Sequence, residues 1–162
     1  CSYADWGFLI SEDEMTGEIS AYTFTDYMAP TKRMGWPYGE VEAALVVGCD
    51  DDFEWTYIAF TRRPNLSNTK NSTPSTWPWE FGHDLITTRI KWDEEVEYVT
   101  FKQKWGEKHI SFKNPDENIK NIEKSNKALL ELNWHGEGKI YFKFSLKGSS
   151  AGLKNIRNEC AK

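Results

Sequence analysis

The sequence has 162 residues, a length that suits one domain with its own hydrophobic core. Its shares of hydrophobic residues (39%) and charged residues (28%) argue against a disordered chain. The net charge of −5 argues against a protein that binds nucleic acid through phosphate contacts. No apolar run approaches the roughly 20 residues of a transmembrane helix. Aromatic residues make up 15% of the chain, so they are the first candidates for function.

The first residues suggest processing at the N-terminus, and we divide the chain into a segment 1–5 and a single domain 6–162. A mature chain that begins with Cys and Ser is typical of a bacterial lipoprotein, in which Cys1 would carry the lipid anchor. Alternatively, residues 2–4 end a secretory signal that is cleaved before Asp5, or Cys1 is left over from expression. The first two interpretations both imply export.

Alternating apolar and polar residues predict a series of short strands. The clearest strand covers 139–147, and it follows a strand over 128–134. Between them, Gly136 and Gly138 suit a hairpin turn that needs positive φ angles. Further strands are predicted over 6–10, 18–24, 42–49, 54–62, 84–92, 95–104 and 109–112. Short strands at regular spacing indicate a mainly β protein, an antiparallel β-sandwich.

Two short helices complete the predicted fold. The first begins at Pro115 with Asn114 as its N-cap, and it places Ile119 and Ile122 on one apolar face. The second is C-terminal and covers 149–159. The segment 63–78 is polar and contains three prolines, so it is predicted as a long loop.

The cysteines predict a disulfide between the sheet and the last helix. Cys49 ends an apolar strand, whereas Leu153, Ile156 and Cys160 share one helical face. If that face packs under the sheet, Cys49 and Cys160 can meet; the alternative is two buried free thiols. A disulfide agrees with export. None of the three cysteines lies in a C-x-x-C pair, so nothing indicates a zinc site.

A series of landmarks along the chain resembles one protein family. They are, in order, Trp6, the Asp-Glu-Met-Thr-Gly box at 13–17, the apolar strand that ends at Cys49, the acidic turn 50–52, the aromatic strand 55–60, the strand end 144–148 and Cys160. In this order they resemble the type VI secretion-associated lipoproteins of the TagO/VasI type. The resemblance implies an exported accessory domain, periplasmic or anchored to the outer membrane. The chain departs from the family pattern at Gly48, where an arginine is usual, and in the long loop before Trp77.

Catalytic and metal-binding patterns are missing from the sequence. His83, His109 and His135 are not spaced as metal ligands, so we expect structural or solvent-facing roles for them. The triplet 50–52 lacks the spacing of an EF-hand and is predicted to be a solvated turn. No G-x-S-x-G motif is present. We therefore predict a protein that is not an enzyme and has no metal or cofactor.

The aromatic residues fall into two groups. Rings on strands, such as Tyr57 and Trp134, are predicted to lie in the core or in cross-strand pairs. Four rings lie instead in proline-containing loops: Trp36, Tyr38, Trp77 and Trp79. If exposed, they can bind a sugar face or the apolar surface of a partner. If buried, they form a small core under the loops, and the sequence leaves both interpretations open.

Three hypotheses for function follow. The first is a non-enzymatic envelope or extracellular protein that contacts an envelope or secretion-system protein. The second is a carbohydrate-binding module that uses the four loop aromatics. The third is a subunit that self-assembles into a fibre or surface layer by strand-edge pairing. Against the third, Lys139, Lys143 and Lys147 lie on the last predicted strand, and lysines protect an edge.

Overall fold

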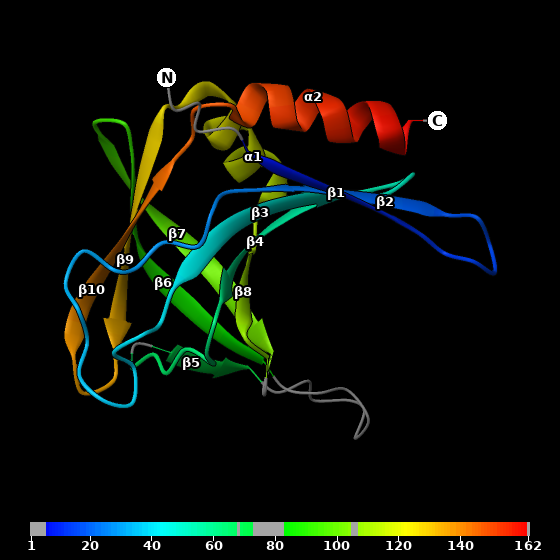
Figure 1. Cartoon of the computed structure of the whole chain (residues 1–162). Coiled ribbons are helices and arrows are strands. Elements are labelled where there is room, and N and C mark those ends of the chain that lie inside the picture. Colours follow the sequence, from blue (N-terminus) through cyan, green and yellow to red (C-terminus); the bar gives the residue numbers. More distant parts are fainter. Residues whose placement is uncertain (1–5, 68, 73–82, 105–106, 162) are drawn as a thin grey trace.

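The computed structural model describes residues 6–67, 69–72, 83–104 and 107–161, and in this part ten strands form one antiparallel sheet with two helices packed on it (Figure 1). The elements are, in chain order, β1 (Gly7–Glu12), β2 (Ile19–Phe24), β3 (Ala43–Cys49), β4 (Glu54–Phe60), β5 (Thr69–Ser72), β6 (His83–Trp92), β7 (Glu95–Lys104), β8 (His109–Phe112), α1 (Pro115–Lys124), β9 (Lys127–Trp134), β10 (Gly138–Ser145) and α2 (Ser149–Cys160). The predicted mainly β fold with two helices is confirmed. Neither helix is long and apolar enough to cross a bilayer.

The sheet folds over on itself. Its strands run in the order β1-β2-β3-β4-β8-β7-β6-β9-β10, and β5 pairs with β6 to one side. Phe60 on β4 contacts Phe142 on β10 and Trp134 on β9, with ring centroids 5.7 and 5.9 Å apart. The two halves of the sheet therefore face each other across a shared core. The predicted antiparallel sandwich is confirmed, in the form of one continuous sheet.

The β9–β10 hairpin follows its sequence pattern closely. On β10, Ile140 and Phe142 are buried, whereas Lys139 and Lys143 are exposed. The turn between the strands places Gly136 at φ 81° and Gly138 at φ 78°, so both predicted glycines adopt the left-handed conformation that other residues avoid. Alternation on a strand and glycine in its turn together specified this hairpin.

Helix α1 begins where its sequence predicts, with the predicted N-cap residue but without a side-chain capping bond. Asn114 occupies the N-cap position and Pro115 the first turn, but the Asn114 side chain makes no capping hydrogen bond. Its carbonyl instead accepts hydrogen bonds from the backbone and side-chain N–H groups of Asn118. Ile119 and Ile122 are buried, as their spacing predicts.

Helix α2 lies along the β1–β2 hairpin and covers its core face (Figure 1). Leu153, Ile156 and Cys160 are buried on one helical face. A Cβ atom at Gly152 would lie 2.4 Å from Thr23 Oγ1, so this glycine lets α2 approach β2 closely. The Cys49–Cys160 disulfide is confirmed, with the Cα atoms 6.2 Å apart.

One predicted loop is wrong in part. Within the segment 63–78, Thr69–Ser72 forms β5 and pairs with β6, and Leu66 makes a bridge to Trp134. Backbone pairing does not require apolar side chains, so a polar strand leaves no hydropathy signal. Residues 73–82 of this region lie outside the described part of the chain.

Candidate functional site

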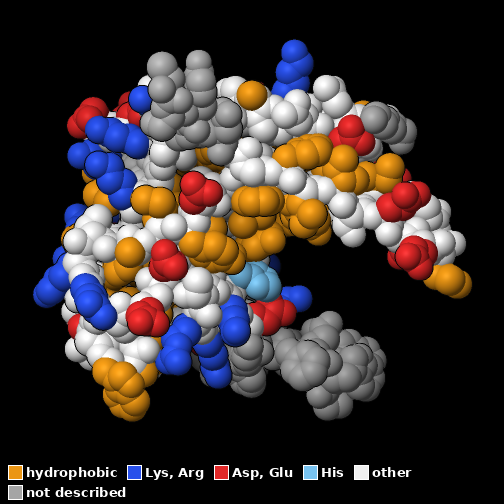
Figure 2. Space-filling model, viewed as in Figure 1, with side chains coloured by type: hydrophobic (Ala, Val, Ile, Leu, Met, Phe, Trp, Pro, Cys, Tyr) orange, Lys and Arg blue, Asp and Glu red, His pale blue; other side chains and the backbone are white. Residues whose placement is uncertain are grey.

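The solvent-side face of β1–β4 is hollowed and lined by aromatic and aliphatic side chains. The hollow has a volume of about 480 Å³. Hydrophobic side chains gather along it, below the β1–β2 hairpin (Figure 2). We call this surface the tyrosine hollow, and its main residues are Leu9, Tyr22, Phe24, Tyr27, Val46 and Tyr57.

Strand register places these side chains on one face. Leu9 pairs with Tyr22, Phe24 pairs with Val46, and Val46 pairs with Tyr57. Because directly paired residues point to the same side of a sheet, they form a strip across four strands. The intervening residues of β2, such as Thr23, point the other way and are buried under α2. The rings of the hollow therefore lie on a sheet whose opposite face packs against α2.

A glycine allows two rings of this face to meet. Gly48 pairs with Tyr22 on one side and with Trp55 on the other. The two rings lie edge to face over Gly48, with centroids 6.0 Å apart. A Cβ atom on Gly48 would lie 2.6 Å from Trp55 Nε1 and 2.9 Å from Tyr22 Cδ1. Gly48 therefore leaves room for the two rings to pack against each other.

Tyr57 lines the tyrosine hollow, where it makes one of the predicted contacts between neighbouring strands and lies outside the closed core. Its ring is half-buried and packs against His109, with centroids 5.1 Å apart. His109 Nε2 lies 2.8 Å from Glu107 Oε2. Burial raises the pKa of the Tyr57 hydroxyl, and the nearby Tyr22 and Tyr27 hydroxyls raise it further. Tyr57 therefore remains protonated and can donate a hydrogen bond at neutral pH.

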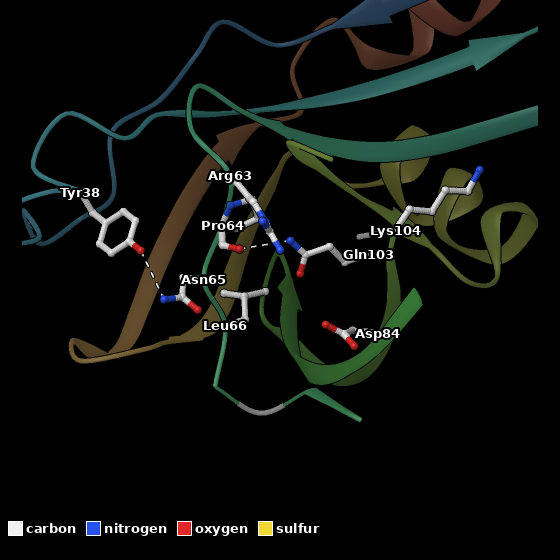
Figure 3. Close-up of a pocket in the computed structure, with 8 residues that line it drawn as sticks. All are labelled: Tyr38, Arg63, Pro64, Asn65, Leu66, Asp84, Gln103 and Lys104. Atoms are coloured by element: carbon white, nitrogen blue, oxygen red, sulfur yellow. Dashed lines mark hydrogen bonds between the residues drawn. The ribbon is translucent and has the colours of Figure 1, made fainter. Parts of the chain in front are cut away.

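A second concavity, which we call the polar pocket, lies beside one of the loop aromatics (Figure 3). It has a volume of about 390 Å³. Tyr38 Oη accepts a hydrogen bond from Asn65 Nδ2 at 3.3 Å, and Gln103 Nε2 donates to the Pro64 carbonyl at 3.1 Å. The side chains that line it and can hydrogen-bond a ligand are Tyr38, Arg63, Asn65, Asp84, Gln103 and Lys104.

The four loop aromatics lie in different environments. Trp36 is 94% exposed. Tyr38 is half-buried, packs edge-on against Trp134 with centroids 5.4 Å apart, and borders the polar pocket. Trp77 and Trp79 lie outside the described residues. Of the predicted binding residues that the structure describes, Trp36 is the one fully open to a ligand.

The predicted acidic turn and His135 have ordinary surroundings. Asp50 Oδ1 accepts hydrogen bonds from the backbone N–H groups of Asp52 and Phe53, which makes the triplet a turn as predicted. His135 is exposed in the β9–β10 turn, and the side chain of His83 lies outside the described part. Among the residues that the structure describes, no group of three His, Cys, Asp or Glu side chains is placed to hold a metal ion.

A buried carboxylate on the other half of the sheet is fully engaged. Glu131 on β9 accepts hydrogen bonds from Arg89 Nη2 at 2.5 Å, from Arg89 Nε at 3.2 Å and from Tyr141 Oη at 2.9 Å. The hydrogen bond from Arg89 is the main reason that the pKa of Glu131 is lowered. Since partners on two neighbouring strands use both carboxylate oxygens, this cluster joins β6, β9 and β10 and is structural.

The lowered pKa of Glu131 predicts acid sensitivity. The ion pair contributes stability above the ordinary pKa of 4.5, and that contribution is lost as the pH falls through the lowered value. We therefore expect Glu131→Gln to be less stable than the wild type at pH 7, with the difference shrinking below pH 4.5. Urea unfolding at a series of pH values measures it, and Glu14→Gln, an exposed change, is the control. A difference in unfolding free energy between the wild type and Glu131→Gln that stays the same from pH 7 to below pH 4.5 would contradict this role.

Comparisons of the chain with protein-family models, curated proteins and solved structures found no match. The resemblance to TagO/VasI lipoproteins therefore stays a prediction from the sequence.

Proposed function

We propose that this chain is a non-enzymatic exported protein that binds a protein partner in the tyrosine hollow, as an accessory or assembly factor of the cell envelope. The tyrosine hollow is the observation that carries the proposal. Tyrosine and phenylalanine are enriched where proteins bind one another, and an apolar surface of this kind is costly to leave in water. The rings sit on paired strands, so little conformational freedom is lost on binding.

The chemistry of the hollow favours an apolar protein segment over a sugar. One hydroxyl of the hollow is already engaged within the protein. In the hollow, the Thr25 hydroxyl already donates to the Asp26 carbonyl and accepts from the Leu45 N–H. Aliphatic side chains such as Leu9 and Val46 lie among the tyrosines. Apolar side chains of a partner would displace water from these groups, while the tyrosine hydroxyls orient its backbone.

Export is supported by the Cys49–Cys160 disulfide, since such bonds persist in oxidising compartments. The lipid anchor at Cys1, a periplasmic or outer-membrane location and a secretion-system partner rest on the sequence resemblance. Mass spectrometry of the mature protein tests the anchor. An acylated Cys1 is expected, and a free Cys1 thiol or a chain that begins at Asp5 would remove the anchor from the proposal.

Site-specific photo-cross-linking in the producing cells tests the binding surface. A cross-linking residue at Tyr27, on the rim of the hollow, is expected to give one discrete protein adduct. The matched control is Tyr98, an exposed tyrosine on β7 that does not line the hollow. Equal adducts from both positions, or none from Tyr27, would refute the proposal.

The affinity of the identified partner then measures the contribution of the hollow. We expect Tyr57→Ala to weaken binding by roughly tenfold or more, the effect of losing an aromatic hot spot. Tyr98→Ala is expected to bind as the wild type does. Circular dichroism of both variants shows whether the fold is intact, and unchanged binding by a folded Tyr57→Ala would count against the hollow.

A second candidate is carbohydrate binding at Trp36 and the polar pocket. The exposure of Trp36 favours it, because an open indole is a stacking platform for a sugar ring. Tyr38, two residues along the chain, brings the polar pocket into the same region. Titration with envelope glycan fragments, followed by tryptophan fluorescence, should then give saturable binding that Trp36→Ala weakens about tenfold. Saturable binding that is unchanged in Trp36→Ala, or no binding, eliminates this candidate.

A further inference from the structure

Among the residues that the structure describes, strand β1 leaves one edge unpaired. In the described part of the chain it pairs with β2 alone, and it is the first strand in the sheet order. Phe8, Leu9 and Ile10 in its middle are 42%, 56% and 43% exposed. An exposed edge with three successive apolar side chains is a template for pairing with another strand.

The opposite edge of the sheet is protected. On β10, Lys139 and Lys143 are exposed, and the Tyr141 carbonyl accepts a hydrogen bond from the Thr31 N–H at 2.9 Å. Lysines and a covering loop are two of the devices that keep sheet edges apart. By comparison, β1 (Gly7–Glu12) contains no lysine, arginine or proline. The two ends of the described strand order therefore differ, and of β1 and β10 it is β1 that is open to pairing.

We propose that β1 pairs antiparallel with β1 of a second copy of this chain, about a two-fold axis at Leu9. In a continuous sheet, directly paired residues of two strands point to the same face. Since faces alternate along a strand, the two-fold axis must pass between two copies of the same residue, not between neighbouring positions. An axis at Leu9 places Leu9 against its own counterpart and Phe8 against Ile10 of the second copy. An axis at Ile10 would place Phe8 against Glu12 instead. The pairing at Leu9 joins apolar side chains on both faces.

Charge favours the same arrangement. The acidic residues Glu12, Asp13 and Glu14 follow directly after the apolar part of β1. About a two-fold axis at Leu9, the acidic turns of the two copies lie at opposite ends of the pair. A parallel pairing in register would bring them side by side, which is unfavourable. The two-fold pairing also uses up the open edge, so assembly stops at a dimer and does not continue into a fibre.

The dimer should be weak on its own. A strand pair of five residues buries less than the roughly 800 Å² per partner of a stable interface. Its dissociation constant is therefore expected in the micromolar to millimolar range. Leu9 also lines the tyrosine hollow, so the two hollows of a dimer would adjoin at the axis.

Sedimentation of the oxidised protein tests the pairing. From about 10 μM to about 1 mM, the mass is expected to rise from 18.8 kDa towards twice that value. Leu9→Lys should remain a monomer, because it places two positive charges at the axis. The matched control is Val96→Lys, an exposed apolar position on β7, and it should dimerise as the wild type does. A wild type that stays monomeric at about 1 mM, species larger than a dimer, or dimerisation by Leu9→Lys would each overturn the proposal.

Cysteine cross-linking tests the register. In a Cys1→Ser background, Leu9→Cys should form an intermolecular disulfide on mild oxidation, since directly paired Cα atoms lie within disulfide reach. Ile10→Cys should cross-link much more slowly, because Ile10 then faces Phe8 of the second copy. Faster cross-linking through Ile10→Cys would overturn the axis at Leu9.

Discussion

Replacement of both Cys49 and Cys160 by alanine is expected to lower the free energy of unfolding by about 4–5 kcal/mol. The bond joins residues 111 positions apart, so it removes a large loop-closure entropy from the unfolded chain. Both cysteines are buried in the core, and alanine leaves no thiol there that could form another bond. Loss of the bond also releases α2 from the end of β3.

Urea unfolding measures this loss. With an m value of about 2 kcal/mol/M, the midpoint should fall by about 2 M. Reduced wild-type protein should unfold near the same midpoint as the double variant, while the oxidised Cys1→Ala variant should match the oxidised wild type. A shift of less than about 0.5 M in the double variant would mean that the disulfide adds little to the fold.

Phe142→Ala is expected to destabilise the protein by about 3–5 kcal/mol. Phe142 is fully buried where the two halves of the sheet face each other. Its ring centroid lies 5.7 Å from that of Phe60 and 6.3 Å from that of Trp134. Truncation loses the burial of the ring and leaves a cavity between β4 and β10, which the surrounding strands can close only in part.

The matched control for Phe142→Ala is Phe53→Ala in the β3–β4 turn. Phe53 is 71% exposed, so its truncation should change stability by less than about 0.5 kcal/mol. The same urea series measures both variants. Similar losses for the two would show that the sheet halves do not depend on each other for stability.

Much of the fold could be predicted because its signals are local. The buried Ile140, Phe142 and Phe144 alternate with less buried residues, and this pattern specifies β10 and its inward face. The spacing of Ile156 and Cys160 specifies the buried face of α2, and the disulfide follows once that face packs on the sheet. Such periodicities depend on strand and helix geometry alone, so they need no knowledge of the tertiary contacts.

The tyrosine hollow could not be predicted, because both faces of its strands carry apolar residues. On β4, Ile58 and Phe60 point into the core, whereas Trp55 and Tyr57 point to the other side. Alternation separates these two sets but does not say which one meets water. The packing of the helices and of the β9–β10 hairpin against one face decides that, and it joins segments far apart in the chain. β5 was missed since its polar sequence carries no strand signal.

The distance between the two bonded cysteines also sets an order of events during synthesis. Cys49 is made 111 residues before Cys160, which at ribosomal speed is roughly 5–20 s. Within this sequence, Cys1 is the one other cysteine that precedes Cys160. An oxidant that acts before Cys160 emerges can therefore join Cys49 to another molecule, or to Cys1 while that residue carries no lipid, and never to its native partner. Correct pairing requires either late oxidation or an isomerase that reopens the early bond.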